Sequence, residues 1–389
     1  MRLLFCWLLL VSACRASDGP PKPERHDGPR AAQSRSQPNP AVASSADGNE
    51  DPLVSDPSAT PSSSAVARAL IEIRTRALSL AAPPLGARHL AFGKGFVLQL
   101  RAGEAISFDS TDGRELARVA LKEPRATVAL PAGSVLVAAL DASYRFDPGQ
   151  KRPHTLARLS LLPGFVLEPR RDTQDLVWVL QAPLKRIQRY MLEPDAGLGL
   201  ESERELEQYD GGPFTTLSDG SFLYTARNRA GLVHRVGFGA PKVLDFPADV
   251  GVIWRLAAAD RIDRAWVVTA SGAVLLVELG VRLRVVRLMR TGLAPFDFAA
   301  TASRFALVSL TERSTEPRRF TLGVYTGAGL QLYSHDLGAT EPTASPEWAA
   351  RMVVDRELVL GGDPPRVGIG GPSSLRVFEL ASGKELFAR

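Results

Sequence analysis

Cysteine is nearly absent from this chain: 389 residues include two, Cys6 and Cys14. Cys6 lies in an apolar N-terminal segment of the kind that export machinery removes. A mature chain beginning at Cys14 has no second cysteine and so forms no internal disulfide. It also has no set of thiolates for a metal site, and we assign it no cysteine nucleophile. The shortage of cysteine therefore excludes a disulfide-stapled fold and cysteine-based chemistry.

The N-terminal apolar run lacks the length of a membrane span. Leu3–Val11 contains nine apolar residues, and nine helical residues extend about 13 Å, against the ~30 Å hydrocarbon core of a bilayer. The positively charged Arg2 precedes the run, and the small residues Ser12 and Ala13 follow it. A charged start, a short apolar segment and small residues are typical of a secretory signal peptide.

The end of this segment, Val11-Ser12-Ala13-Cys14, resembles the lipobox of bacterial lipoproteins. The resemblance implies cleavage after Ala13 and acylation of the thiol and the new amino group of Cys14. Two or more acyl chains hold a protein stably on a membrane. We therefore expect residues 1–13 to be a signal peptide and Cys14 to carry the lipid. The alternative is an ordinary secretory signal.

The location within the envelope is predicted from the residue after Cys14. In enterobacterial lipoproteins an aspartate there retains the protein at the inner membrane, whereas this chain has Arg15. We expect a lipid anchor in the outer membrane facing the periplasm, with exposure at the cell surface as an alternative.

Residues 14–64 lack the apolar side chains that a folded core requires. From residue 15 to residue 64 there are nine prolines, ten serines and three glycines, but only three bulky apolar residues, Val42, Leu53 and Val54. Such a composition predicts a disordered tether. Residues 65–87 are apolar again, and their spacing predicts a short helix, although the alternation between Leu70 and Arg76 also fits a strand.

Residues 88–389 lack any long helical periodicity. Short runs of β-favouring residues are separated at about ten-residue spacing by Gly, Pro, Asp and Ser clusters, which is typical of an all-β domain. The predicted strands include Phe96–Arg101, Ser134–Leu140, Asp175–Gln181, Ser221–Ala226, Ala265–Thr269, Ala273–Leu279, Phe305–Thr311, Phe320–Thr326 and Glu357–Leu360.

A repeat of 40–45 residues limits the all-β folds that the domain could adopt. Phe108–Leu121 is echoed by Phe146–Leu161 and by Val377–Arg389, with a strand, a glycine turn and a second strand in each copy. This period predicts a β-propeller of four-stranded antiparallel sheets. The length gives seven blades, with six or eight, or a pair of β-sandwiches, as alternatives. The repeats resemble WD repeats and quinoprotein-type repeats, although the Trp-Asp signature is missing.

A propeller ring must also close. The final repeat ends soon after Leu386, so we expect its last strand to be short. Unpaired edges in the first and last blades would favour aggregation. We therefore expect a strand from residues 65–92 to pair with the C-terminal repeat and complete the ring.

The positive charge lacks the concentration that nucleic acid requires. The net charge is +5, with forty arginines and only seven lysines, and the arginines are scattered through the chain. Nucleic-acid binding needs a basic stripe, so we expect no nucleic-acid partner. The acidic segments 201–210 and 312–319 are expected to be solvated loops, or part of a recognition face.

Catalytic and ligand-binding motifs are weak or absent. No Gly-x-Ser-x-Gly sequence is present to place a hydrolase nucleophile. Asp109–Gly113 fits a hairpin turn better than a calcium loop. Gly368–Gly371 lacks the spacing of a phosphate loop, and we expect an ordinary loop there.

The histidines and tryptophans also suggest structural roles. The domain's histidines lack metal-ligand spacing, and we expect isolated surface or core residues: His89, His154, His234 and His335. Trp178, Trp254 and Trp266 lie in strand-like runs and are expected to pack between blades. Trp348 is expected in a loop.

The sequence thus predicts a lipid-anchored cell-envelope propeller that acts as a non-enzymatic interaction module for a protein or glycan. We assign it no catalytic residue, cofactor or metal ligand. The alternative is a propeller enzyme, similar to quinoprotein dehydrogenases or calcium-dependent hydrolases, that uses the central funnel.

Overall fold

A computed structural model describes the chain from residue 88 to residue 389. The exceptions are residues 158, 160–164, 170–175, 182–183, 194–196, 207–208, 210–211, 218–220, 226–231, 237–241, 246–251, 260, 262, 281–282, 292–293, 302, 312–318 and 340–355. The predicted signal peptide, Ala13, Cys14, the tether and the segment 65–87 therefore lie outside the described residues. So do Trp348 and most of the acidic segment 312–319.

The described residues form strands and turns, as the all-β prediction required. All nine predicted runs coincide with strands, to within a few residues at their ends. Within this part of the chain, no helix is long and apolar enough to cross a membrane.

Four consecutive strands build each sheet. The first three sheets contain β1 (Leu90–Gly93), β2 (Phe96–Arg101), β3 (Glu104–Asp109), β4 (Glu115–Ala120); β5 (Ala126–Ala129), β6 (Val135–Ala138), β7 (Ser143–Phe146), β8 (His154–Leu156); and β9 (Phe165–Pro169), β10 (Leu176–Gln181), β11 (Arg186–Glu193), β12 (Gly197–Glu205). The next two contain β13 (Phe214–Thr216), β14 (Phe222–Tyr224), β15 (Leu232–Val236), β16 (Lys242–Asp245); and β17 (Ile253–Ala258), β18 (Arg264–Thr269), β19 (Ala273–Leu279), β20 (Leu283–Arg290). The last two contain β21 (Ala294–Ala300), β22 (Arg304–Thr311), β23 (Arg319–Thr326), β24 (Gln331–Ala339); and β25 (Glu357–Gly361), β26 (Arg366–Gly370), β27 (Leu375–Glu379), β28 (Glu385–Ala388).

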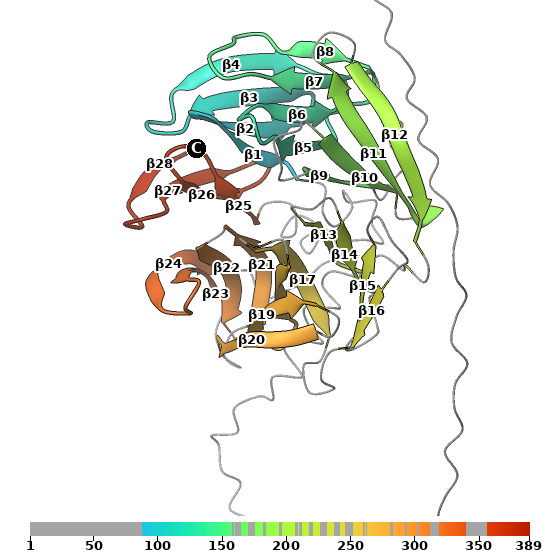
Figure 1. Cartoon of the computed structure of the whole chain (residues 1–389). Coiled ribbons are helices and arrows are strands. Elements are labelled where there is room, and N and C mark those ends of the chain that lie inside the picture. Colours follow the sequence, from blue (N-terminus) through green and yellow to red (C-terminus); the bar gives the residue numbers. More distant parts are fainter. Residues whose placement is uncertain are drawn as a thin grey trace, which may run out of the picture. The chain divides into compact units, whose positions relative to one another are not determined.

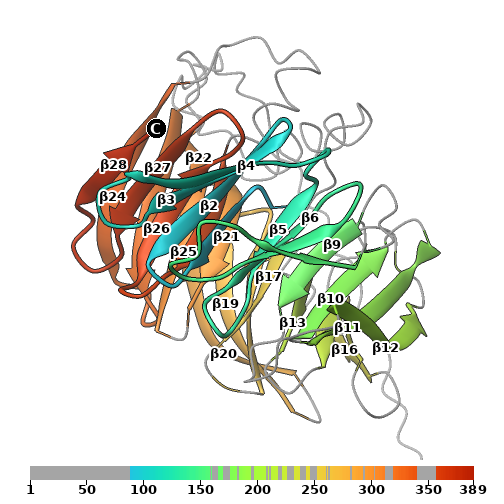
Figure 2. The ribbon, with the colours of Figure 1, turned by 90° about the horizontal axis from the view of Figure 1, so that it is seen from above.

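The seven sheets are antiparallel and follow one another around a ring. In each sheet the strand order is the chain order, so the first strand lies at one edge and the fourth at the other. The first strands contact one another in sequence from β1 through β5, β9, β13, β17 and β21 to β25, and β25 contacts β1 (Figures 1 and 2). This arrangement confirms the β-propeller prediction, with the first strands innermost and the fourth strands outermost.

Of the segment expected to close the ring, residues 65–92, only residues 88–92 are described, and they do not pair with the last sheet. Leu90–Gly93 pairs with β2 of its own sheet, and among the described strands β28 pairs with β27 alone. The first and last sheets therefore meet side by side, as Figure 1 shows, without exchanging a strand. Residues 65–87 are not described.

The sequence repeat corresponds to the same turn in different sheets. Between β3 and β4, Asp109 N donates to Arg114 O and Gly113 N donates to Asp109 O. Between β27 and β28, Glu379 and Gly383 make the equivalent bonds to Lys384 O and Glu379 O. Gly113 and Gly383 have φ of 71° and 77°, a conformation that favours glycine. The hairpin-turn prediction for Asp109–Gly113 is confirmed.

The predicted loop at Gly368–Gly371 is wrong over most of its length. Gly368 and Gly370 belong to β26, a central strand that pairs with both β25 and β27. A Cβ on Gly368 would lie 3.1 Å from the ring of Phe92 in the first sheet, and one on Gly361 would lie 3.0 Å from its Cβ. The glycines are needed because the side chain of Phe92 packs against the last sheet.

The predicted loop at residues 201–210 is also wrong in part, since residues 201–205 belong to β12. Glu201 and Glu203 extend from this outermost strand to Arg189 and Arg186 on β11. Their charges are tolerated because the fourth strand is exposed on the outside of the sheet. Acidic composition suggested a loop, but cross-strand ion pairs permit a strand.

Buried aromatic side chains fill the interfaces between sheets. Trp178 of the third sheet lies 5.7 Å from Phe222 of the fourth, and Trp266 of the fifth lies 5.2 Å from Phe305 of the sixth, measured between ring centroids. Trp254 donates its indole N–H to Phe296 O across the same fifth-to-sixth interface. The predicted packing of these tryptophans between sheets is confirmed.

Candidate functional site

The innermost strands surround a cavity of about 170 Å³. Its wall includes Phe92 from β1, Leu256 from β17, Phe298 from β21 and Leu360 from β25, with Thr127 and Thr215 from β5 and β13. Most of these side chains are apolar, in keeping with the burial of β1, where all four residues are buried. Arg88, just before β1, brings a charge to this cavity.

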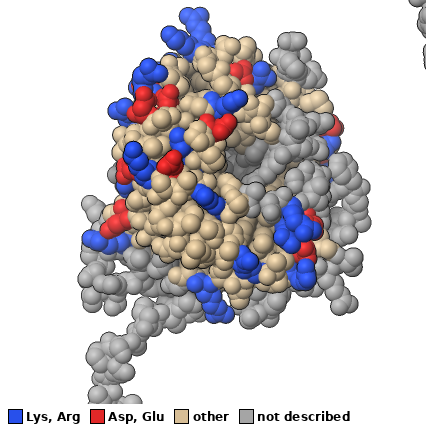
Figure 3. Space-filling view, turned by 60° about the vertical axis from the view of Figure 1, so that its left-hand side comes forward, with Lys and Arg blue, Asp and Glu red and all other residues tan. Residues whose placement is uncertain are grey.

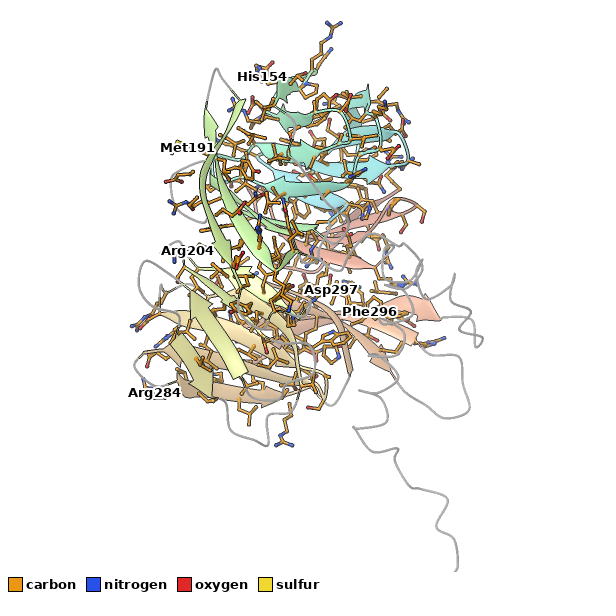
Figure 4. The ribbon with its side chains drawn as sticks, turned by 90° about the vertical axis from the view of Figure 1, so that its right-hand side faces the viewer. His154, Met191, Arg204, Arg284, Phe296 and Asp297 are labelled. Carbon is orange, nitrogen blue, oxygen red and sulfur yellow. The ribbon has the colours of Figure 1, made fainter. Side chains whose placement is uncertain are left out.

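A buried aspartate ties together four sheets beside the cavity. Asp297, on β21, is only 3% exposed, and Figure 4 shows it within the interior of the assembly. Arg88 of the first sheet donates to its Oδ2 at 2.7 Å, and Arg255 of the fifth donates to its Oδ1 at 3.0 Å. The backbone N–H of Leu358, in the last sheet, donates to Oδ2 at 2.9 Å.

A second carboxylate joins the last sheet to the first. Glu357, the first residue of β25, is buried. Its Oε2 accepts the backbone N–H groups of His89 and Leu90 at 2.6 and 3.2 Å, and its Oε1 lies 2.7 Å from His89 Nδ1. Both oxygens of the carboxylate are therefore held by the chain entering β1.

The cluster balances its own charge. Burial lowers the pKa of Arg255, while the adjacent Asp297 opposes that shift, and the guanidinium remains charged in ordinary buffers because an arginine pKa starts so high. Two arginines face two carboxylates, and every carboxylate oxygen accepts at least one hydrogen bond. Such buried, saturated groups hold elements together, and neither carboxylate has an oxygen left without a partner to act as a general base.

The histidines predicted to be isolated are separated in the structure. His89, His154, His234 and His335 belong to the first, second, fourth and sixth sheets or their flanks. His335 Nε2 lies 2.7 Å from Gly383 O, and its ring stacks on Phe378 at 4.8 Å between centroids. His154 Nε2 lies 3.3 Å from Asp147. Among the described residues, no group of three or more His, Cys, Asp and Glu side chains could hold a metal ion.

Charged side chains of both signs share the surface. On the face shown in Figure 3, basic and acidic groups are interspersed with uncharged ones. Arg118, for example, contacts both Glu104 and Glu115, and Arg376 contacts Glu385. Exposed pairs of this kind contribute little stability, but they neutralise the basic side chains locally.

Exposed apolar side chains concentrate on the outermost strands. Leu288 on β20 is 50% exposed, and Leu330, immediately before β24, is 68% exposed. The others on fourth strands are Leu116, Leu200, Val243, Val286 and Leu332, whereas Leu184 and Met191 lie elsewhere in the third sheet. The outer strand of the fifth sheet touches the sixth through Arg287, which donates to Gly327 O. Apolar groups are therefore presented to solvent on neighbouring outer strands.

Sequence reasoning missed the charged cluster at the cavity. Asp297 stands alone in the apolar run Phe296–Ala300, and Arg255 stands alone in Ile253–Ala259. A single charge within a buried strand requires a partner, and this is the sequence signal that could have pointed to the two residues. Their partners belong to strands dozens of residues away, and only the ring brings them together.

Comparison with known proteins identifies the fold without a family. No protein-family model matches the chain, and no curated protein sequence matches it. A functionally unknown protein from Desulfotomaculum acetoxidans is similar in structure, with 14% identity and a TM-score of 0.56 over 76% of this chain and 95% of that one. Hsv2 from Kluyveromyces lactis is 9% identical, with a TM-score of 0.48 over 77% and 91% of the two chains.

The WD40 domain of SCAP from fission yeast is 10% identical, with a TM-score of 0.47 over 78% of this chain and 86% of that one. At such identities, a structural likeness supports the fold alone.

Proposed function

We propose that this chain is a lipid-anchored cell-envelope β-propeller that acts as a non-enzymatic interaction module for a protein or glycan. The observation that carries the interaction role is the exposure of apolar side chains along the outermost strands, above all Leu288 and Leu330. Water-exposed apolar groups on adjacent elements favour contact with a partner. The fourth strands lie at the edges of their sheets among the described strands, and an edge strand offers backbone donors and acceptors.

The central cavity is less suited to catalysis. The two buried carboxylates beside it, Asp297 and Glu357, do not line it and are occupied by bonds that join the sheets. A general base must reach a substrate proton, and breaking these bonds would expose unpaired buried charges. We therefore favour the interaction module over a funnel enzyme.

The anchor is proposed from the N-terminal sequence. Cys14 follows a short signal-like segment and precedes a Pro- and Ser-rich tether. Cells grown with a clickable fatty acid should label the wild-type chain and the Cys6→Ala control equally. Cys14→Ala should lose the label, and persistent labelling of that variant would contradict the anchor.

The interaction role is tested in intact cells with a photo-crosslinking amino acid at Leu288 or Leu330. We expect both positions to join the chain to the same envelope protein or glycan, and the double variant Leu288→Glu, Leu330→Glu to lose that product when the probe is at Leu332. The matched control places the probe at Thr111, an exposed turn residue of the first sheet. Equal products from all positions, or none from the outer strands, would contradict the role.

A further inference from the structure

The fourth strands of several sheets share one position at a register shift. We call it the knob position and define it by its partner in the third strand. It is Tyr333 opposite Val324 in the sixth sheet, Phe387 opposite Val377 in the seventh, and Ala117 opposite Ser107 in the first. In each case the register shifts between the knob residue and the residue two positions before it in the fourth strand. The third and fifth sheets have Ser202 and Arg287 there, so the type of side chain differs between sheets.

An aromatic knob fills the interface with the following sheet. Phe387 packs in one buried cluster with Val377 of its own sheet and Phe108 of the first. Its ring covers the turn glycine so closely that a Cβ on Gly113 would lie 2.5 Å from it. Tyr333 covers Gly383 in the same way, at 2.6 Å.

A hydrogen-bond donor two residues later completes each contact. Arg389 donates from Nε and Nη2 to Gly113 O at 3.1 and 3.0 Å. His335 Nε2 lies 2.7 Å from Gly383 O. Residues two apart in a strand point to the same side, so the ring and the donor reach the same turn together.

At the first sheet this position holds Ala117. A cavity of about 120 Å³ is lined by Ser107, its cross-strand partner, and by Leu116, its neighbour in the strand. The cavity is lined by Phe96, Ser107 and Leu116 of the first sheet, and by Phe146, Asp147 and residues 149–151 of the second. Ser107 is the counterpart of Val377, and Phe146 is the counterpart of Phe108 in the sequence repeat. Gly149, with φ of 75°, has no atom within 4 Å of an added Cβ.

The cavity suits an apolar occupant. Its one carboxylate, Asp147, is already held by Ser134 at 2.5 Å and by Arg145 at 3.1 Å. Buried cavities of ~150 Å³ lined by apolar side chains bind benzene, so the size matches an aromatic ring. Leu116 is 37% exposed, and Gln150 and Lys151 are exposed, which leaves the mouth open to solvent.

The donor is missing as well as the ring. Val119 occupies the position two residues after Ala117, where the seventh and sixth sheets have Arg389 and His335. Ala117 and Val119 therefore offer the turn of the second sheet neither an aromatic ring nor a side-chain donor. Its carbonyl groups carry partial negative charge, and a cationic donor complements them as Arg389 complements Gly113 O.

We propose that this cavity binds an aromatic side chain of a partner protein, in an extended segment with a basic residue two positions after the aromatic one. The chain itself shows the fit, because Phe387-x-Arg389 and Tyr333-x-His335 fill the equivalent places between other sheets. This inference rests on the proposed interaction role and names one partner chemistry for it.

The test uses saturation-transfer NMR on the full chain with the acetylated and amidated peptide Gly-Phe-Ser-Arg as the probe. We expect saturation of the phenylalanine ring protons with the wild-type chain. The peptide Gly-Ala-Ser-Arg should show none, and Gly-Phe-Ser-Ala should bind several-fold more weakly because it loses the donor. A ring signal as strong in Gly-Phe-Ser-Ala would overturn the basic-residue part.

Ala117→Phe should remove the ring signal by filling the cavity from within. Ala120→Phe is the matched control and should bind normally, since Ala120 is exposed at the end of the same strand and its cross-strand partner Glu104 does not line the cavity, whereas Ser107, the partner of Ala117, does. If Ala117→Phe does not fold, Ala117→Leu provides a smaller filling group with the same expected loss. No ring signal in the wild-type chain, or an equal signal in a folded Ala117 variant, overturns the proposal. Crosslinking at Leu288 and Leu330 tests the proposed interaction role independently, so the cavity proposal and the interaction role can each be contradicted without the other.

Discussion

The interface between the last and first sheets differs sharply from the interface between the first and second. Across the former, Phe387 covers Gly113, Glu357 holds His89 and Leu90, and Gln99 Nε2 donates to Gly371 O at 2.5 Å. Across the latter, backbone bonds such as Lys94 N to Gly133 O join the sheets over an apolar cluster, and a cavity remains.

The difference follows from chain connectivity. The first and second sheets are joined by the short connection from Leu121 to Arg125, so the chain itself keeps them close. No connection joins the last sheet to the first, and their encounter must offset the entropy of closing a very long loop. Of these two interfaces, the one without a covalent connection has the side-chain bonds, and the linked one retains an unfilled space.

The largest expected effect comes from removing the charge of Asp297, which connects the sixth sheet to the first, fifth and last sheets. Asp297→Asn leaves Arg88 and Arg255 without their counter-ion, and breaking a buried pair costs about 3–5 kcal/mol. Urea unfolding should show this loss in the free energy of unfolding. Asp263→Asn, which removes an exposed partner of Arg261, should change it by less than about 1 kcal/mol. Equal effects would show that the buried cluster does not hold the ring.

Phe387→Ala removes the ring from the interface between the last and first sheets, so that this interface resembles the one between the first and second sheets. Removing a buried phenylalanine should lower the free energy of unfolding by about 3 kcal/mol, and the edge strands β1 and β25 should lose amide protection against hydrogen exchange. Leu116→Ala, at an exposed position, is the control and should cost less than about 1 kcal/mol. Unchanged amide protection of β1 would contradict the role of the Phe387 side chain in joining the last sheet to the first.

Ala117→Phe is the reverse of Phe387→Ala, since it adds an aromatic ring at the knob position of the first sheet. Filling the cavity should raise the free energy of unfolding by about 1 kcal/mol, as cavity-filling substitutions commonly do. Ala120→Phe adds the same ring to an exposed site outside the cavity lining and should give no gain. A loss of stability in the first variant would mean that the space cannot accept a ring.

The smallest effect concerns Tyr333, the knob of the sixth sheet. Burial raises its pKa to about 12, because removal from water disfavours the charged phenolate. The neutral phenol packs against Gly383 and donates to Glu379 O. Its stabilisation should be complete below about pH 10, the unfolded value, and should decline as the pH rises toward about 12. Urea unfolding across this range should show the decline in the wild-type chain, and Tyr333→Phe should lack that component.

The sequence predicted the class of fold because its evidence is local. Turn glycines such as Gly113 and Gly383, and the runs around them, specify hairpins within each sheet. Closure could not be predicted in the same way, since the contacts of Asp297 with Arg88 and Leu358 join residues that are far apart in the chain. Among the described residues, side chains join the last sheet to the first.

The cavity at Ala117 was hidden for a related reason. The repeat aligned Leu116 with Leu386, which places Ala117 opposite Phe387 in the alignment, but composition alone gives no sign that the larger residue fills an interface. The role of this position becomes clear only in the structure, where the ring of Phe387 covers Gly113.

The most direct test of the equivalence between the two interfaces is a crystal structure of the Ala117→Phe chain. The introduced ring should occupy the cavity between Phe96 and Phe146, against Gly149, with the first and second sheets unmoved. A ring turned into solvent, or a turn at residues 149–151 displaced to admit it, would contradict the account.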